Sequence, residues 1–163
     1  MIKYWSGSLK LFLAEPFATR WAERDPFAEA FAISGDTYRD MGDRRTTRFE
    51  FDGAAYFVKT HAGVGVGEIL KNLLYLRIPV LGAENEYRAI ARLKELGVDT
   101  MTAVAFGRRG WNPANEQSFL ITRALEPTEP LDEYCNPRVL AAMGVAERRA
   151  LVRRLARISR SLH

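Results

Sequence analysis

The chain has 163 residues and a formal net charge of +4, with 47% hydrophobic and 27% charged residues. This length and balance fit one globular domain with at most a small appendage, and exclude wholesale disorder and a bundle of membrane-spanning helices. One cysteine and two histidines exclude a disulfide framework and a cysteine-only zinc site. Six arginines lie in residues 145–163, so the positive charge is confined to one segment. Nucleic-acid binding typically needs a broad basic surface, and we therefore expect no nucleic-acid partner.

Apolar periodicity and turn residues divide the chain into helices and strands. The pair Asp52-Gly53 stands between two β-prone runs and is the strongest hairpin signal in the sequence. A third run before it would complete an antiparallel meander whose first turn lies at 40–43. In chain order we predict a helix at 17–32, strands near 37–39, at 46–51 and at 54–61, helices at 68–76 and 84–96, strands at 100–106 and 118–124 with a polar loop at 107–117 between them, a proline-containing connector at 125–137, and an arginine-rich helix at 145–160.

Lys59 lies near the end of the third predicted strand, where strand alternation puts it on one face with Phe57. A lysine on an apolar strand needs a partner, because an unpaired buried charge costs about 3–5 kcal/mol. The helix at 84–96 offers Glu84 and Glu86, of which Glu86 shares a face with Ile90. A strand lysine held by a helix glutamate is how protein kinases position the phosphates of ATP, whereas a lysine extended toward solvent beside an unrelated glutamate would give the same spacing.

Three glycines, Gly63, Gly65 and Gly67, follow the third predicted strand and precede a helix. This order is similar to a dinucleotide-binding loop, but the spacing is GxGxG rather than GxGxxG, and residues 77–83 are a poor candidate for the parallel strand that such a fold requires. A tight turn is the preferred interpretation. The alternative is an anion site at the N-terminus of the following helix.

An ordered series of segments resembles one family, the lipopolysaccharide core heptose kinases of the RfaP/WaaP type, over about residues 9–163. Among these segments is Tyr56-Phe57-Val58-Lys59, which contains the strand lysine. A long ordered run of this kind is more specific than any single short motif. The matching segments are 38–39, 44–46, 56–61, 63–65, 67–69, 71–74, 79–83, 85–90 and 118–122.

This resemblance implies an α+β, protein-kinase-like fold: an N-terminal lobe of antiparallel sheet and packed helix, a hinge, and the first helices of a second lobe. It implies phosphorylation of a heptose in the lipopolysaccharide inner core, with ATP and Mg²⁺. The acceptor would be the lipid-anchored core oligosaccharide. The enzyme would work at the cytoplasmic face of the inner membrane of a Gram-negative bacterium, in peripheral contact with that membrane.

The resemblance also implies roles for particular residues. Lys59 would contact the ATP phosphates, with Glu86 as its helix partner and Glu84 as the second choice. The turn at 40–43, which contains Gly42, takes the place of the phosphate-covering loop. The hinge against which adenine stacks includes Thr122, Arg123, Ala124 and Leu125.

The family's catalytic aspartate and metal-binding aspartate would both follow His163. The resemblance therefore implies that the chain contains no catalytic residue or metal ligand and is a truncated lobe, inactive by itself, of a sugar kinase. We expect an N-terminal extension at 1–35, an ATP-binding lobe at 36–124, and a hinge with the start of the helical lobe at 125–163.

Two other functions remain open. One is a related kinase of the same fold that acts on a Kdo sugar or a small alcohol, although residues 62–83 match the heptose-kinase pattern. The other is a non-catalytic nucleotide-binding or interaction module. The arginines of 145–160 would either contact lipopolysaccharide phosphates and an anionic membrane or form a solvated face, and His61, on the face of Lys59, is expected to make a structural hydrogen bond.

Overall fold

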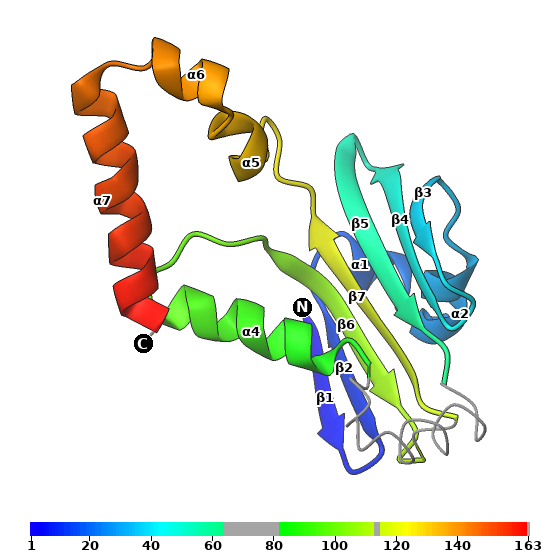
Figure 1. Cartoon of the computed structure of the whole chain (residues 1–163). Helices are drawn as coiled ribbons and strands as arrows, with labels where there is room; N and C mark the ends of the chain where they lie inside the picture. The colour runs from blue at the N-terminus through cyan, green and yellow to red at the C-terminus, as the bar shows by residue number, and fades with distance from the viewer. Residues whose placement is uncertain (64–81, 113–114, 163) are drawn as a thin grey trace, which may run out of the picture. The chain divides into compact units, whose positions relative to one another are not determined.

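The computed structural model describes residues 1–63, 82–112 and 115–162. In these residues seven strands form one antiparallel sheet in the order β1-β2-β6-β7-β5-β4-β3 (Figure 1). The strands are β1 (Ile2–Ser6), β2 (Leu9–Leu13), β3 (Asp36–Asp40), β4 (Arg44–Phe51), β5 (Ala54–His61), β6 (Ala103–Arg109) and β7 (Gln117–Arg123). The helices are α1 (Phe17–Arg20), α2 (Pro26–Ala32), α4 (Glu84–Glu95), α5 (Leu131–Tyr134), α6 (Pro137–Ala142) and α7 (Val145–Leu162).

The predicted meander β3-β4-β5 is confirmed. Asp52 and Gly53 form the two-residue turn between β4 and β5, with φ angles of 49° and 69°. Two successive positive φ angles are what a type I′ turn requires, and the twist of that turn matches the twist of the two strands. The turn fixes the register, so that Thr46 lies opposite Lys59.

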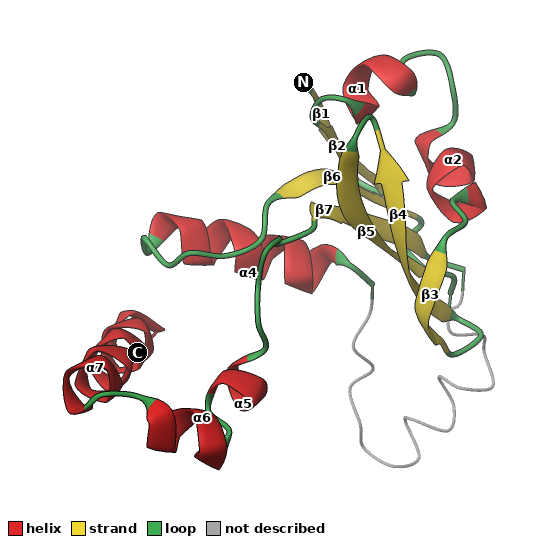
Figure 2. Cartoon of the chain, turned by 90° about the horizontal axis from the view of Figure 1, so that it is seen from above, coloured by secondary structure: helices red, strands yellow, loops and turns green. Residues whose placement is uncertain are grey.

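The sheet buries both faces, each against different helices (Figure 2). On one face, Phe17 and Phe27 from α1 and α2 pack with Val58 and Phe119 of the sheet. On the other face, Ile90 of α4 belongs to a smaller cluster, whose other buried members are Ala83, Phe106 and Leu120. Alternation along β5 puts Tyr56, Val58 and Thr60 toward the first face, which directs Lys59 to the face of α4.

Strands β1 and β2 were not predicted. They form a hairpin, and β2 pairs with β6 on the far side of the sheet, with Leu9 opposite Arg109. Leu13 ends β2 inside the main core, where it is 1% exposed. Residues 2–13 thus belong to the sheet itself, and the boundary at residue 35 stays a prediction.

Three predicted elements need correction. The single helix at 17–32 is wrong, because Pro26 lacks the N–H that a continuing helix needs and instead begins α2 behind the capping carboxylate of Asp25. The loop at 107–117 is shorter than predicted, since β6 extends to Arg109 and β7 begins at Gln117. The connector at 125–137 contains α5, and α6 begins at its last residue. The predicted helix at 68–76, with Gly65 and Gly67, lies outside the described residues.

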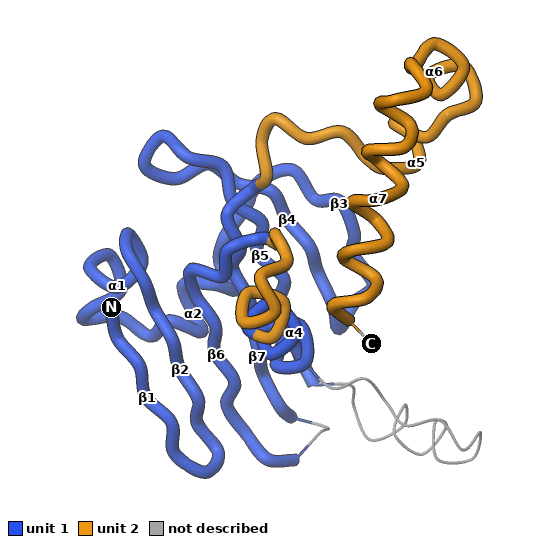
Figure 3. The backbone as a smooth tube through the Cα atoms, turned by 90° about the vertical axis from the view of Figure 1, so that its left-hand side faces the viewer, with its two compact units in different colours: residues 1–91, 101–124 blue, residues 92–100, 125–163 orange. Residues whose placement is uncertain are grey.

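The chain forms two compact units (Figure 3). The first comprises residues 1–91 and 101–124 and contains the whole sheet. The second comprises residues 92–100 and 125–163; there, α7 is confirmed as an amphipathic helix, and Arg154 contacts Asp99 at 3.3 Å. None of the described helices is long and apolar enough to cross a membrane.

Candidate functional site

Lys59 and Glu86 form an ion pair in the first unit. The Nζ of Lys59 on β5 donates to Oε1 of Glu86 on α4 at 2.5 Å, across 27 residues of sequence. Each side chain is about one-third exposed, at 34% and 32%. The predicted partnership of Lys59 with Glu86 is confirmed, and the pair remains accessible to a ligand.

The packing of α4 explains why Glu86 reaches Lys59. Tyr87 stacks on Phe106 of β6, with ring centroids 4.4 Å apart, and Ile90 is 4% exposed against the same face of the sheet. Residues four apart lie on one side of a helix, so the burial of Ile90 turns Glu86 toward the sheet as well. Leu120 lies opposite Lys59 in β7 and completes an apolar floor beside the ion pair.

The turn at 40–43 contains a glycine in the left-handed backbone conformation. Gly42 has a φ of 76°, and its N–H donates to Oδ1 of Asp40 at 3.1 Å. A cavity of about 210 Å³ lies beside this turn, with Phe31 and Thr60 in its wall. Gly42 also lines this cavity, whereas Lys59 does not, because Thr60 points to the opposite face of β5 from Lys59.

The predicted hinge residues continue β7 and then leave it. Thr122 is 4% exposed inside the sheet, while the N–H groups of Arg123 and Ala124 donate to Thr102 and Ala55 at 2.9 Å each. Leu125 is half exposed, and its carbonyl accepts a hydrogen bond from Thr128 Oγ1 at 2.7 Å. The N–H groups of Arg123 and Ala124 are therefore already used within the sheet, and a role for these four residues in adenine binding stays a prediction.

His61 ends β5 on the same face as Lys59. Burial lowers its pKa, and the nearby positive charge of Arg44 lowers it further, against the opposing effect of Glu86. The imidazole is therefore neutral at neutral pH. Its buried Nδ1 has no hydrogen-bond partner in the described parts of the chain, so the structural hydrogen bond expected for His61 is not found at this atom.

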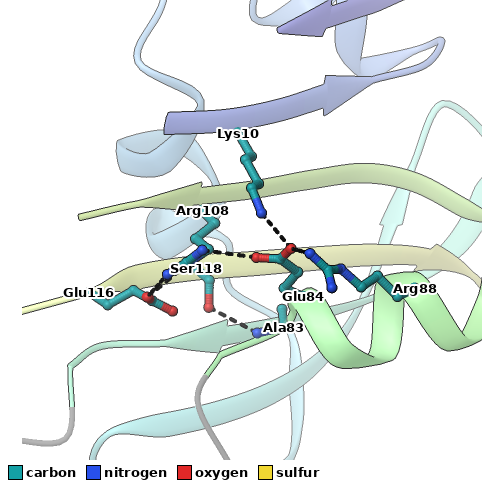
Figure 4. Close-up of polar contacts among 7 residues, drawn as sticks. All are labelled: Lys10, Ala83, Glu84, Arg88, Arg108, Glu116 and Ser118. Atoms are coloured by element: carbon teal, nitrogen blue, oxygen red, sulfur yellow. Dashed lines mark hydrogen bonds and ion pairs between the residues drawn. The ribbon is translucent and has the colours of Figure 1, made fainter. Parts of the chain in front are cut away.

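Glu84, the second choice for pairing with Lys59, is at the centre of a separate cluster (Figure 4). It accepts hydrogen bonds from Lys10, Arg88 and Arg108. Burial alone would raise its pKa, but the hydrogen bond from Lys10 and the charges of Lys10 and Arg88 hold that pKa below its ordinary value. Sequence reasoning missed this cluster, because Lys10 reaches Glu84 through the unpredicted pairing of β2 with β6.

The resemblance implies Mg²⁺ as a cofactor of the kinase. Within 1–63, 82–112 and 115–162, no group of three histidine, cysteine, aspartate or glutamate side chains is placed to hold a metal ion. Magnesium in proteins is bound through carboxylates together with the phosphates of the substrate. Binding of Mg²⁺ together with the nucleotide stays a prediction.

An antiparallel sheet whose strand lysine is ion-paired with a glutamate of the helix on the same face is the arrangement of the N-terminal lobe of a protein-kinase-like fold. A model of the lipopolysaccharide kinase (Kdo/WaaP) family matches residues 28–163. The chain belongs to this family.

Individual relatives support membership of this family. The chain is 48% identical over 151 residues to lipopolysaccharide core heptose(I) kinase WaaP of Escherichia coli, covering 93% of this chain and 57% of the relative. It is 47% identical over 155 residues to the WaaP kinase of Pseudomonas aeruginosa, covering 95% and 58%. A solved structure, WaaP in complex with acyl carrier protein, is 40% identical with a TM-score of 0.77, covering 94% of this chain and 56% of that one. The chain thus spans somewhat more than half the length of these relatives.

Proposed function

We propose that this chain supplies the ATP-binding lobe of a kinase that phosphorylates a heptose of the lipopolysaccharide inner core. The observation that carries the proposal is the ion pair of Lys59 with Glu86 at 2.5 Å, on the helix-covered face of the sheet. The family and the heptose(I) kinases among its relatives support the acceptor class. The acceptor would be the core oligosaccharide, at the cytoplasmic face of the inner membrane.

In this proposal Lys59 binds the phosphates of ATP. Its ammonium group carries three N–H donors, of which Glu86 needs one, so the others remain for phosphate oxygens. Glu86 would hold the lysine in place while the nucleotide is absent and orient it when the phosphates arrive. A preformed arrangement of this kind requires no reorganisation of the charge during the reaction.

Adenine would bind along the hinge. The hinge N–H groups of Arg123 and Ala124 are used by the sheet, whereas no backbone carbonyl of the described residues accepts from the N–H of Leu125. We therefore assign the hydrogen bond to the adenine ring to the Leu125 N–H, and the stacking contacts to the hinge side chains. Magnesium, where bound, would neutralise the phosphate charge.

The first experiment compares Lys59→Met with Lys94→Met, a lysine that is exposed on the same helix as Glu86. Hydrogen bonds to charged groups contribute about 1.5–3 kcal/mol, so we expect Lys59→Met to weaken ATP binding at least about tenfold, as measured by calorimetric titration. Lys94→Met should bind ATP as the unaltered protein does. Equal affinity in all three proteins would contradict the assignment of Lys59.

A second candidate function is phosphorylation of a Kdo sugar, because the family name covers both Kdo and WaaP kinases. Two purified lipopolysaccharides, one carrying inner-core heptose and one ending at Kdo, separate these functions as acceptors of radiolabelled γ-phosphate. The transfer is measured with a full-length kinase that includes this lobe, because the lobe is expected to be inactive by itself. Labelling of only the heptose-containing acceptor supports the proposal. Labelling of the Kdo-terminated acceptor favours the alternative, and ATP binding without transfer to either acceptor favours a non-catalytic nucleotide-binding module.

One solved relative was determined in complex with acyl carrier protein. We extend this partner to the present chain as a proposal, supported by 40% identity over 94% of the chain. Co-purification of the chain with acyl carrier protein tests it, and failure of the two to associate in gel filtration would contradict it.

A further inference from the structure

We propose that Glu84 is a positioning residue for the nucleotide site. Glu84 fixes the first turn of α4 on the sheet, and α4 in turn presents Glu86 to Lys59. The proposal rests on the proposed function of Lys59 and Glu86 in ATP binding. It gives the N-terminal hairpin, through Lys10, a part in forming that site.

The geometry of Glu84 carries the first step. Its side chain is 12% exposed, and both carboxylate oxygens are occupied (Figure 4). Oε1 accepts from Lys10 Nζ of β2 at 2.5 Å and from Arg88 one turn along α4, while Oε2 accepts from Arg108 Nη1 of β6 at 3.0 Å. Two strands therefore hold one carboxylate at the beginning of the helix.

The groups that hold Glu84 are themselves fixed. Arg108 donates from Nε to Oε2 of Glu116 at 2.8 Å, and Glu116 is only 7% exposed. Beside it, the N–H of Ala83 donates to Oγ of the buried Ser118 at 3.0 Å. The start of α4 is thus attached to β7 through its backbone and to β2 and β6 through Glu84.

The approach to the helix is equally restricted. Gly82 has a φ of 70°, and a Cβ atom at this position would lie 2.8 Å from both Glu116 Oε1 and Ser118 Oγ. Only glycine fits this backbone conformation at this distance. A side chain at position 82 would therefore overlap Glu116 and Ser118, which lie beside the cluster.

Glu84 and Glu86 are two residues apart, which on an α-helix separates their directions by about 200°. Glu84 reaches toward β2 and β6, and Glu86 toward β5. A rotation of α4 about its axis that released Glu84 would move Glu86 away from Lys59. The two carboxylates therefore restrict the rotation of the helix in addition to the buried Ile90.

The charges favour orientation over stability as the role of this cluster. Three cations surround the two carboxylates Glu84 and Glu116, and replacing such a partly buried network by apolar groups is often neutral for stability. A fixed direction of the helix is what the network provides. Removing a single partner is a different change, because it leaves the remaining charges uncompensated. Loss of Glu84 alone should therefore appear in ligand binding as well as in unfolding.

The test is a double-mutant cycle in ATP affinity. Glu84→Gln keeps the shape and removes the charge, and we expect it to weaken ATP binding about threefold to tenfold. In a Glu86→Gln background the same substitution should have no further effect, because Glu84 acts through Glu86. Glu95→Gln, an exposed carboxylate of α4 paired with Arg92, is the matched control and should leave the affinity unchanged.

Lys10 provides a second test that leaves the core intact. Lys10→Met should weaken ATP binding in the same way, and Lys10→Arg should restore it. Lys3→Met is the control, because Lys3 lies over the ring of Trp5 at 5.6 Å much as Lys10 does at 5.9 Å, but has no bond to Glu84. Unchanged affinity in both Glu84→Gln and Lys10→Met, or effects that add to that of Glu86→Gln, would overturn the inference.

A readout without ATP separates this inference from the proposed function. The coupling between Lys59 and Glu86 is obtained from urea unfolding of Lys59→Met, Glu86→Gln and the double variant. We expect this coupling to be present in the unaltered protein and lost when Glu84→Gln is added. If Lys59→Met leaves ATP binding unchanged, the proposed function fails, and persistence of the coupling in Glu84→Gln would overturn the positioning role independently.

Discussion

Gly107 of β6 and Phe119 of β7 lie opposite each other in the sheet, and the ring of Phe119 occupies the space where a side chain at 107 would be. A Cβ atom there would come within 2.3 Å of the ring carbon Cε1. Phe119 is fully buried and contacts the rings of Trp21 and Phe27, with centroids 6.0 and 5.2 Å away, so it has no space into which to move.

Gly107→Ala should therefore destabilise the protein by about 1–3 kcal/mol, the range typical of an overpacked core. Urea unfolding followed by tryptophan fluorescence measures the change. A smaller side chain at position 119 should relieve the overlap, so Gly107→Ala should be less destabilising in a Phe119→Leu background. Equal effects in the two backgrounds would show that the overlap is not the cause.

The carboxylate of Asp25 caps α2, accepting from the N–H of Phe27 at 3.0 Å. Asp25→Ala removes this acceptor and should lower the free energy of unfolding by about 1 kcal/mol. Asp25→Asn retains a capping oxygen and should be close to neutral, because the ion pair with Arg109 is largely exposed and contributes little. A loss as large in Asp25→Asn as in Asp25→Ala would mean that the ion pair dominates.

Acid should reveal the ionised state of Glu84. Its pKa is lowered in the folded protein, through its bonds to Lys10 and Arg88, despite burial. The stability that this provides is complete above the ordinary pKa of 4.5 and is lost as the pH falls through the lowered folded value. As the pH falls below 4.5, the difference in unfolding free energy between the unaltered protein and Glu84→Gln should shrink steadily. A constant difference would be inconsistent with the lowered pKa.

Protonation of His61 should change the stability in a higher pH range than protonation of Glu84. Burial and the charge of Arg44 lower its pKa, so the unfolded chain takes up the proton first as the pH falls below about 6.5. The folded state is therefore favoured above that pH and progressively disfavoured below it. His61→Gln should remove this part of the pH dependence below about pH 6.5, measured against the unaltered protein, and an unchanged profile would exclude His61 as its source.

Local sequence patterns predicted the features that depend on residues close together in the sequence. Asp52-Gly53 marked the β4-β5 hairpin. Periodicity offered Glu84 and Glu86 as partners for Lys59, the family resemblance favoured Glu86, and the structure pairs Lys59 with Glu86 at 2.5 Å. Each of these depends on a few consecutive residues and on the alternation that backbone geometry imposes.

Other features depend on contacts that no local pattern contains. The sequence at 11–14 reads as a short apolar run, and pairing with both β1 and β6 makes residues 9–13 a strand. The cluster around Glu84 follows from the same pairing. The roles of Gly42 and of the hinge residues 122–125 came from family resemblance, and they remain predictions because they concern a nucleotide.

The pairing of β2 with β6 also has a consequence for synthesis on the ribosome. Leu9 pairs with Arg109, 100 residues later in the chain. At a translation rate of about 5–20 residues per second, the β1-β2 hairpin waits roughly 5–20 s before its partner strand is made. Throughout that interval the edge of β2 that pairs with β6 has no strand to bond to, so the nascent chain is most exposed to wrong strand pairing before β6 emerges.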